Sequence, residues 1–260
     1  MRVLFVKQDH ASPSGLVGDA FTSLGWDASE LIVVPESRYH SPDVPAVFPS
    51  AAAFDALVFY GALWSVYDQA TIGTWINDEI AFARSAISLG VPVLGICFGG
   101  QMLATAVGGS VSLAPAPEIG WISLSTTAPD LIEAGPWFSW HFDRFALPSG
   151  VDVLARTSAA DQAFSVGRTL GLQFHPEVNT DVLETWLSTD GEAQLAEVGL
   201  AAAPLLAQTR LLTDAAAARA QSLIRRFVTD VARRPMVAPP ALPLAAPAAA
   251  GDATVLTPLR

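Results

Sequence analysis

Short apolar runs alternate with helix-compatible segments through the first hundred residues of the chain. The clearest run, Val91–Ile96, carries no polar side chain, which is typical of a parallel strand covered on both faces of its sheet. Further strands are expected at Val3–Val6, Ala28–Val34 and Ala56–Tyr60, and helices around Leu16–Leu24 and over Asp68–Leu89. Strands that alternate with helices through short links predict an open α/β sheet.

The pattern changes after Gly109, where the runs become shorter and alternate between apolar and polar residues. They predict hairpin-like strands, inserted before the last core strand, at Ile119–Ser123, Val151–Arg156, Gln162–Val166 and Leu170–Phe174. Helices are then expected over Thr180–Leu187 and Ala193–Val231, the second broken at Gly199 or Pro204. The predicted fold class is α/β: a flavodoxin-like, open and mostly parallel sheet flanked by helices, with a smaller antiparallel strand insertion.

The length of 260 residues suits one large domain better than two. We expect this domain to span residues 1–234. From Pro235 the chain is rich in alanine and proline, so residues 235–260 are expected to form an extended or disordered tail.

The charge of the chain argues against a nucleic-acid partner. The net charge is −11, and the basic pairs Arg225-Arg226 and Arg233-Arg234 lie near the end of an expected helix, where cations are favoured. The N-terminal segment lacks the long apolar region of a signal peptide, and no uncharged segment suits a membrane span. A single cysteine excludes an intrachain disulfide. We therefore expect a cytoplasmic protein that binds neither nucleic acid nor a membrane.

The single cysteine lies between an expected strand and an expected helix, in Gly95-Ile96-Cys97-Phe98-Gly99-Gly100-Gln101. A nucleophile with glycine two residues before and after it is the layout of a nucleophile elbow, whose turn is too tight for side chains at those positions. At the start of a helix, backbone N–H groups and the helix dipole favour the thiolate. The pattern favours a catalytic nucleophile over the alternative, a buried structural cysteine.

A histidine and an acid follow another expected strand, in Gln173-Phe174-His175-Pro176-Glu177. A thiol nucleophile needs a base, and the base needs a group that holds its tautomer. Sites in open α/β sheets form beyond the carboxyl ends of the strands, so we expect Cys97 and His175 to meet there. By itself the His-Pro-Glu triplet also fits an ordinary loop. Joined to the elbow, it predicts a catalytic triad of Cys97, His175 and Glu177.

The other histidines carry weaker signals. His141, in Trp140-His141-Phe142-Asp143, lies in a stretch expected to be irregular, where a substrate-pocket role and a structural role are equally open. His10 and His40 lie in expected loops and are interpreted as solvated. With four histidines and one cysteine, none at zinc-ligand spacing, we expect no metal site.

Four stretches of the chain resemble the class I (triad) glutamine amidotransferases. Gly95–Gln101 and Gln173–Glu177 carry the class pattern, and Pro117–Trp121 and Trp140–Pro148 resemble the small stand-alone branch called GMP-synthase-like amidotransferases. The resemblance runs from about Val3 to Phe227 and implies a central, mostly parallel sheet flanked by helices. It also implies attack by Cys97 on the side-chain amide of glutamine. A γ-glutamyl thioester and ammonia would form, and water would then release glutamate.

The resemblance further implies an oxyanion hole made by the backbone N–H groups of Phe98 and Ala62. The family loop commonly reads glycine-glycine-proline, whereas this chain has Gly61-Ala62-Leu63. The hole is therefore either built differently or formed only when substrate binds. The implied substrate-binding residues are Gly61, Gln101, Trp140, His141 and Phe142, with Gln101 and the backbone around Trp140–Phe142 holding the glutamyl α-amino and carboxylate groups.

The sequence therefore predicts a cysteine-dependent hydrolase of the γ-amide of glutamine or of another γ-glutamyl compound, without a cofactor. Two alternatives stay open: a subunit that supplies ammonia to a separate synthetase partner, and a non-catalytic binding or regulatory subunit with the same fold. The second is disfavoured because nucleophile, base and orienting group are all present. Trp64, Tyr67 and Trp140 are candidates for the mouth of the site, with ordinary core packing as the alternative.

Overall fold

Five parallel strands form the centre of the structure, a computed structural model that describes residues 1–235. In sheet order they are β2 (Asp27–Ile32), β1 (Arg2–Lys7), β3 (Ala56–Phe59), β4 (Val93–Ile96) and β10 (Thr169–Leu172). The order 2-1-3-4 followed by the last parallel strand is that of flavodoxin-like folds. The predicted open, mostly parallel sheet is therefore confirmed. The predicted tail lies outside the described residues, apart from Pro235.

Antiparallel strands extend this sheet and form a ribbon beside it. β9 (Asp161–Val166), β8 (Asp152–Arg156) and β6 (Ser125–Thr126) continue the sheet beyond β10. β5 (Ser110–Ile122) and β7 (Trp137–Ala146) pair with each other in a separate two-stranded sheet. The predicted antiparallel insertion is thus present, but it divides into an extension of the main sheet and a separate β5–β7 ribbon.

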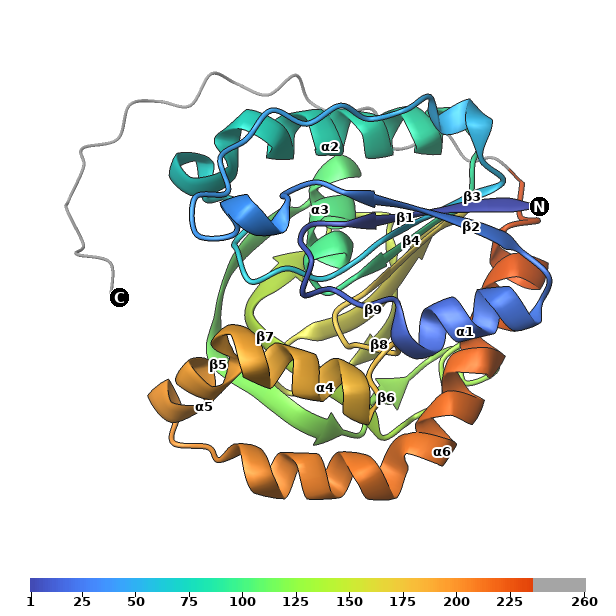
Figure 1. Cartoon of the computed structure of the whole chain (residues 1–260). Coiled ribbons are helices and arrows are strands. Elements are labelled where there is room, and N and C mark those ends of the chain that lie inside the picture. Colours follow the sequence, from blue (N-terminus) through green and yellow to red (C-terminus); the bar gives the residue numbers. More distant parts are fainter. Residues whose placement is uncertain (236–260) are drawn as a thin grey trace.

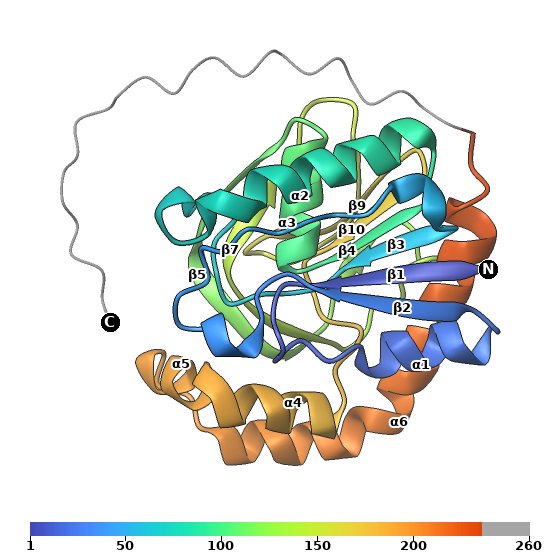
Figure 2. The ribbon, with the colours of Figure 1, turned by 45° about the horizontal axis from the view of Figure 1, so that its top comes forward.

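Helices cover both faces of the main sheet (Figure 1). α2 (Gln69–Leu89) and α3 (Phe98–Ala106) lie on one face, and α1 (Gly15–Ser23) and α6 (Ala202–Arg226) lie on the other (Figure 2). The remaining helical segments are the 3-10 turns Glu36–Arg38 and Ala51–Ala53, α4 (Thr180–Trp186), a π-helical turn Leu187–Gly191, α5 (Glu192–Glu197) and a second π-helical turn Phe227–Val231. Among residues 1–235, no single helix is long and apolar enough to cross a membrane. One bent pair, Thr180–Glu197 with Ala202–Val231 at 117°, has the length and composition.

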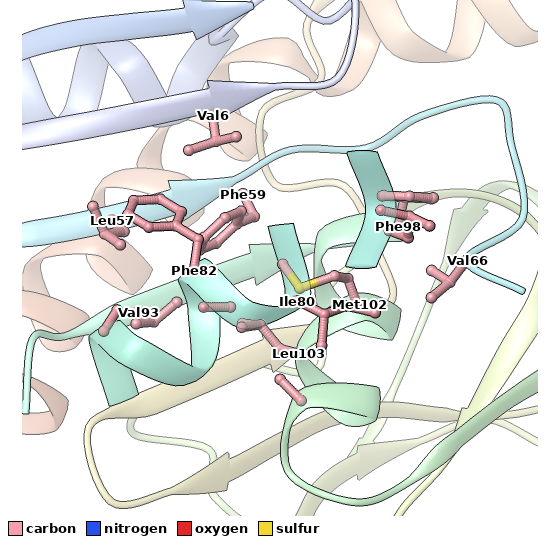
Figure 3. Close-up of a cluster of buried hydrophobic side chains, with 14 of the residues drawn as sticks. Val6, Leu57, Phe59, Val66, Ile80, Phe82, Val93, Phe98, Met102 and Leu103 are labelled. Carbon is pink, nitrogen blue, oxygen red and sulfur yellow. The ribbon is translucent and has the colours of Figure 1, made fainter. Parts of the chain in front are cut away.

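Alternate residues of the parallel strands face the two helical layers. Val3 and Phe5 of β1 pack in the same cluster as residues of α1 and α6, whereas Leu4 and Val6 pack with residues of α2 and α3. Figure 3 shows the second cluster, in which the sheet residues Val6, Leu57 and Phe59 lie near Ile80, Phe82, Met102 and Leu103. β1, β3, β4 and β10 are buried on both faces and are therefore mostly apolar, and this is the signal from which the sheet was predicted. The edge strand β2 is mostly exposed and carries Asp27, Ser29 and Glu30.

Two segments differ from the expectation. β7 occupies a stretch expected to be irregular, because its polar residues Ser139, His141 and Asp143 are buried in the fold. Asp143 accepts hydrogen bonds from Ser65 Oγ at 2.6 Å and Tyr67 Oη at 2.9 Å. The helix expected over Ala193–Val231 breaks at Gly199, whose φ is 73°. Pro204 does not break it, because it lies in the first turn of α6, where a missing N–H leaves no intrahelical bond unmade.

A buried carboxyl group lies between α2 and the sheet. Glu79 is fully buried and accepts a hydrogen bond from Gln8 Nε2 at 2.6 Å, while Glu79 Oε2 and Gln8 Oε1 have no partner among the described residues. Burial raises the pKa of Glu79 to about 8, although the hydrogen bond from Gln8 opposes this shift. A neutral carboxyl can donate a hydrogen bond, which an ionised one cannot. At neutral pH, Glu79 is therefore mostly protonated in the folded chain and ionised in the unfolded chain.

We expect the free energy of unfolding to fall between about pH 5 and pH 8, because the folded chain then holds a proton that the unfolded chain has released. Glu79→Gln keeps the size and a hydrogen-bond donor, and it should remove the part of this slope that Glu79 contributes, which is at most about 1.4 kcal/mol per pH unit. Urea unfolding across this pH range measures the slope. The exposed Glu36→Gln is the matched control and should keep it. Parallel stability curves for Glu79→Gln and the unmodified chain would contradict the prediction.

Candidate active site

Cys97 lies at the turn between β4 and α3. Its φ is 51° and its ψ is −106°, and no other non-glycine residue among residues 1–235 has a positive φ. Backbone strain of this kind costs about 1–3 kcal/mol and persists only where the surrounding structure enforces it. A Cβ on Gly95 would lie 2.5 Å from the Gly99 carbonyl oxygen, and one on Gly99 would meet the Phe59 carbonyl. The tight turn therefore requires both glycines, as the elbow motif predicts. α3 begins at Phe98, directly after the cysteine, which places Cys97 at the helix N-cap.

His175 and Glu177, from the segment after β10, lie beside the thiol. His175 Nδ1 and Glu177 Oε1 are 2.7 Å apart, and both side chains are buried. Cys97 Sγ and His175 Nε2 lie 3.8 Å and 3.4 Å from the same atom, the carbonyl oxygen of Trp140. The structure thus brings together the three residues of the predicted triad.

The electrostatics of this group favour a protonated imidazole. Burial lowers the pKa of His175, but the charges of Glu177 and Cys97, with the hydrogen bond to Glu177, outweigh burial and raise the pKa above its usual value. Because Nδ1 faces Glu177, Nε2 is the nitrogen that faces the thiol. The arrangement can therefore hold a proton at Nε2, next to the sulfur.

Aromatic side chains cover His175. The rings of His175 and Trp186 meet edge to face with centroids 4.8 Å apart, and Trp186 meets Trp140 at 6.1 Å. Trp140 Nε1 donates a hydrogen bond of 2.8 Å to Gln194 Oε1, which connects β7 to α5. The segment 186–194 is therefore held over the histidine and shields one side of it from solvent.

The loop that follows β3 begins beside the triad. A Cβ on Gly61 would lie 3.1 Å from His175 Cε1 and 3.7 Å from Cys97 Cβ. Ser12 Oγ lies 3.0 Å from the Gly61 carbonyl oxygen and 3.1 Å from Asp9 Oδ1, so one hydroxyl proton is shared between two acceptors. The C=O and N–H of a planar trans peptide point in opposite directions, so the contact with Gly61 O fixes the direction of the Ala62 N–H.

The other end of this loop is also held, because Ser65 and Tyr67 both donate to Asp143 of β7. Among the backbone hydrogen bonds that loops and helix caps make within residues 1–235, none is donated by the N–H of Ala62 or of Phe98. Both predicted oxyanion donors therefore lie close to Cys97 without a backbone acceptor. Their role as an oxyanion hole stays a prediction.

A cavity of about 600 Å³, part of it open to solvent, lies against the triad. Of the predicted site residues, His175, Glu177, Gly61, Ala62 and Trp140 line it. The predicted site residues that do not line it are Cys97, Phe98, Gln101, His141 and Phe142. Trp64 and Tyr67 do not line it either. Among the described residues, no three His, Cys, Asp or Glu side chains are grouped so that they could hold a metal ion.

Gln101 and His141 instead make buried contacts behind the site. Gln101 Nε2 donates to the Asp143 carbonyl at 3.2 Å and to Gln173 Oε1 at 3.3 Å, and Gln173 Nε2 lies 3.7 Å from Cys97 Sγ. His141 Nε2 lies 3.1 Å from Glu118 Oε2, in a network with Thr157 and Gln162 that joins the β5–β7 ribbon to the main sheet. This position gives His141 a structural environment. Substrate binding by Gln101, His141 and Phe142 stays a prediction.

Two parts of the site were missed by sequence reasoning. Asp9 and Ser12 follow β1 and line the cavity. They could have been found, since β1 ends at the same edge of the sheet as β4 and β10. Trp186, Asp190 and Gln194 form the opposite wall. No motif in the sequence marks them, because their position depends on how α4 and α5 pack.

An open α/β sheet with a thiol at the elbow, a histidine–carboxylate pair beside it and two nearby backbone N–H groups has the parts needed to cleave an amide. Fold and site together define a cysteine-dependent acyl-transfer enzyme. The family model described as Glutamine amidotransferase class-I matches residues 37–189, more than half of the chain and all three residues of the predicted triad. The chain therefore belongs to the class I glutamine amidotransferases, cysteine enzymes that hydrolyse the amide of glutamine.

Curated relatives include GMP synthases. A glutamine-hydrolysing GMP synthase subunit from Sulfolobus acidocaldarius is 32% identical over 162 residues, which are 56% of this chain and 82% of that protein. The GMP synthase of Aeropyrum pernix is 37% identical over 131 residues, 45% of this chain. The match spans only 25% of the Aeropyrum enzyme's length.

Solved structures share the fold. A glutamine amidotransferase from Thermotoga maritima superposes with a TM-score of 0.76 at 24% identity, over 88% of this chain and 99% of that one. A second, from Methylobacillus flagellatus, has a TM-score of 0.75 at 22% identity, over 90% of this chain and 96% of that one.

Ser12 offers a test of the loop. We expect Ser12→Ala to lower kcat for glutamine hydrolysis by about ten-fold with little change in KM, because the Ala62 N–H loses its fixed direction. The loss is smaller than the roughly 100- to 1000-fold that follows when an oxyanion donor is removed outright, since the N–H itself is still present. Alkylation of Cys97 by iodoacetamide forms no oxyanion, so its rate should stay unchanged, and Ser12→Thr should restore kcat. Equal losses in alkylation and hydrolysis would instead assign Ser12 to thiol placement or stability.

Proposed function

We propose that Cys97, His175 and Glu177 form a catalytic triad that hydrolyses the γ-amide of glutamine or of another γ-glutamyl compound. The observation that carries the proposal is the buried His175–Glu177 pair, 2.7 Å apart, beside a thiol on a strained elbow. A non-catalytic role would not require a positive φ at a cysteine or a buried carboxylate on its histidine partner.

The reaction proceeds through a γ-glutamyl thioester. The Cys97 thiolate attacks the amide carbon, the C–S bond forms, and the carbonyl electrons move to oxygen, where the N–H groups of Ala62 and Phe98 stabilise the charge. The C–N bond then breaks and His175 Nε2 gives its proton to the departing nitrogen. Neutral His175 next takes a proton from water, the hydroxide adds to the thioester, and the C–S bond breaks to return the thiolate and release glutamate.

The chain performs this hydrolysis without a second protein. The support is the loop after β3, which is held by Ser12 at Gly61 and by Asp143 at Ser65 and Tyr67 within one chain. A loop fixed in this way presents the Ala62 N–H before substrate arrives, so no partner is needed to shift it between two states.

A second candidate function is the supply of ammonia to a separate synthetase. The observation that favours it is the Sulfolobus relative, which is named as a subunit of a glutamine-hydrolysing GMP synthase and is covered over 82% of its length. In that case the released ammonia would pass to the synthetase, and the partner would raise turnover.

The purified chain alone should hydrolyse glutamine or a γ-glutamyl amine, and Cys97→Ala should abolish this activity. A glutamine-derived affinity label such as 6-diazo-5-oxo-norleucine should modify Cys97, read by mass spectrometry of the intact chain and its peptides. The control is Ser110→Ala, an exposed change away from the cavity, which should leave activity and labelling as they are. Turnover that appears only on addition of a second protein would favour the ammonia-supplying role. Activity of Cys97→Ala near that of the unmodified chain would end the nucleophile assignment.

The size of the activity loss and the pH dependence of kcat/KM distinguish the roles of His175 and Glu177. His175→Asn should lose about 100- to 10,000-fold in kcat/KM, because the proton donor is gone, while Glu177→Gln should lose less. Glu177 raises the pKa of His175, so Glu177→Gln should move the alkaline limb of the pH profile to lower pH. The profile of kcat/KM between about pH 6 and pH 11 measures the shift. An unmoved limb in Glu177→Gln, or an active His175→Asn, would require other roles.

A further inference from the structure

We propose that the cavity beside the triad binds a positively charged amino group on the leaving side of the substrate, so that γ-glutamyl derivatives of diamines are preferred substrates. This inference rests on the proposed function, since it assumes that Cys97 forms the thioester. In this inference, residues that line the cavity select the leaving group of the substrate, which the triad itself does not do.

The ionisable side chains around the cavity are mostly acidic. They are Asp9, Asp190, Glu177, His175, Tyr39 and Tyr60, and within residues 1–235 no lysine or arginine lines the cavity. Glu177 is engaged by His175, so its charge is matched. Asp9 and Asp190 have no lysine or arginine beside them in this described part of the lining.

The two aspartates influence each other across the cavity. Burial raises the pKa of Asp9, and the charge of Asp190 adds to the rise, although hydrogen bonds from Ser12 and Ala11 and the charge of nearby His10 oppose it. Both hydrogen bonds to Asp9 reach Oδ1, at 2.8 Å and 3.1 Å, which leaves Oδ2 for another donor. Burial raises the pKa of Tyr39, and the nearby Asp190 and Asp9 add to the rise. A cation between the two carboxylates would relieve their repulsion.

Tyr60 gives an independent indication of a ligand. It lines the cavity, is only 1% exposed, and its hydroxyl has no hydrogen-bond partner among the described residues. Burial, together with the charge of Glu177, raises the pKa of Tyr60 well above its usual value, so the hydroxyl stays neutral and can accept a hydrogen bond. A buried hydroxyl without a partner is unfavourable, and an N–H group of a ligand would satisfy it.

His175, which gives the proton to the departing nitrogen, lines the cavity. Of the predicted holders of the glutamyl end, Gln101 and Phe142 do not line it, whereas Trp140 does. We therefore place the leaving group in the part of the cavity next to His175. Trp140, Trp186 and Leu63 add apolar surface that suits the methylene chain between two amino groups. Asp9 and Asp190 both lie outside residues 37–189, the part matched by the family model. Both aspartates are therefore carried by segments beyond that match.

Three substrates with the same glutamyl group test the inference: the γ-glutamyl amides of 1,4-diaminobutane, butylamine and 4-aminobutyrate. Because the leaving groups differ mainly in terminal charge, we expect kcat/KM to be at least about ten-fold higher for the diamine than for butylamine, and lowest for 4-aminobutyrate. Asp190→Asn should reduce the diamine preference to within about three-fold of unity, whereas Asp181→Asn, an exposed aspartate on α4 outside the cavity, should keep it. Equal rates for the three amides, or a preference that survives in Asp190→Asn, would overturn the inference.

A binding measurement separates this inference from the proposed function. Calorimetry on Cys97→Ala, which cannot form a thioester, should show tighter binding of the diamine derivative than of the butylamide. Equal binding would overturn the inference even if the unmodified chain is active. Conversely, an unmodified chain that turns over none of the amides nor glutamine would refute the proposed function, while the binding difference would still support a cation-binding cavity.

Discussion

No side chain fits between helix α3 and the ends of strands β3 and β10. A Cβ on Gly99 would meet the Phe59 carbonyl, and one on Gly100 would meet the Leu172 carbonyl. The two contacts fix Cys97 against both neighbouring strands at once, because β3 leads into the loop at Gly61 and β10 into the segment that carries His175. With backbone packed on backbone, no rotatable side chain lies between them to loosen the geometry, so the positions of thiol, histidine and oxyanion loop all follow from the parallel sheet.

Side-chain hydrogen bonds then fix what the sheet leaves adjustable. Ser12 holds the start of the loop after β3 and Asp143 holds its end, while Gln194 connects the outer wall to Trp140. Each bond joins segments far apart in the chain, so the site is completed only when the whole domain is folded. Groups held before substrate arrives need no reorganisation during the reaction, which is the source of most electrostatic stabilisation in enzymes.

The parallel sheet and the triad were predictable because both have local signals: strands buried on two faces are apolar throughout, and an elbow needs glycines at fixed spacing. β7 was not predictable in the same way. Its Ser139, His141 and Asp143 read as loop residues, yet all three are buried, and His141 and Asp143 find partners on other segments. The cavity wall was missed for a related reason, since Trp186 and Asp190 come into place through helix packing. Features that depend on residues close together in the sequence could be predicted. Features that depend on contacts between distant segments could not.

The segment 186–194 contributes to the site in two different ways. Trp186 shelters the histidine, and a few residues later Asp190 sets the charge of the cavity, yet the side-chain bond from Gln194 to Trp140 attaches the segment to a strand outside the catalytic sheet. Substitutions in this segment would alter which molecules are accepted while the elbow and the sheet stay untouched. The selectivity of the site and its chemistry are therefore carried by separate parts of the chain.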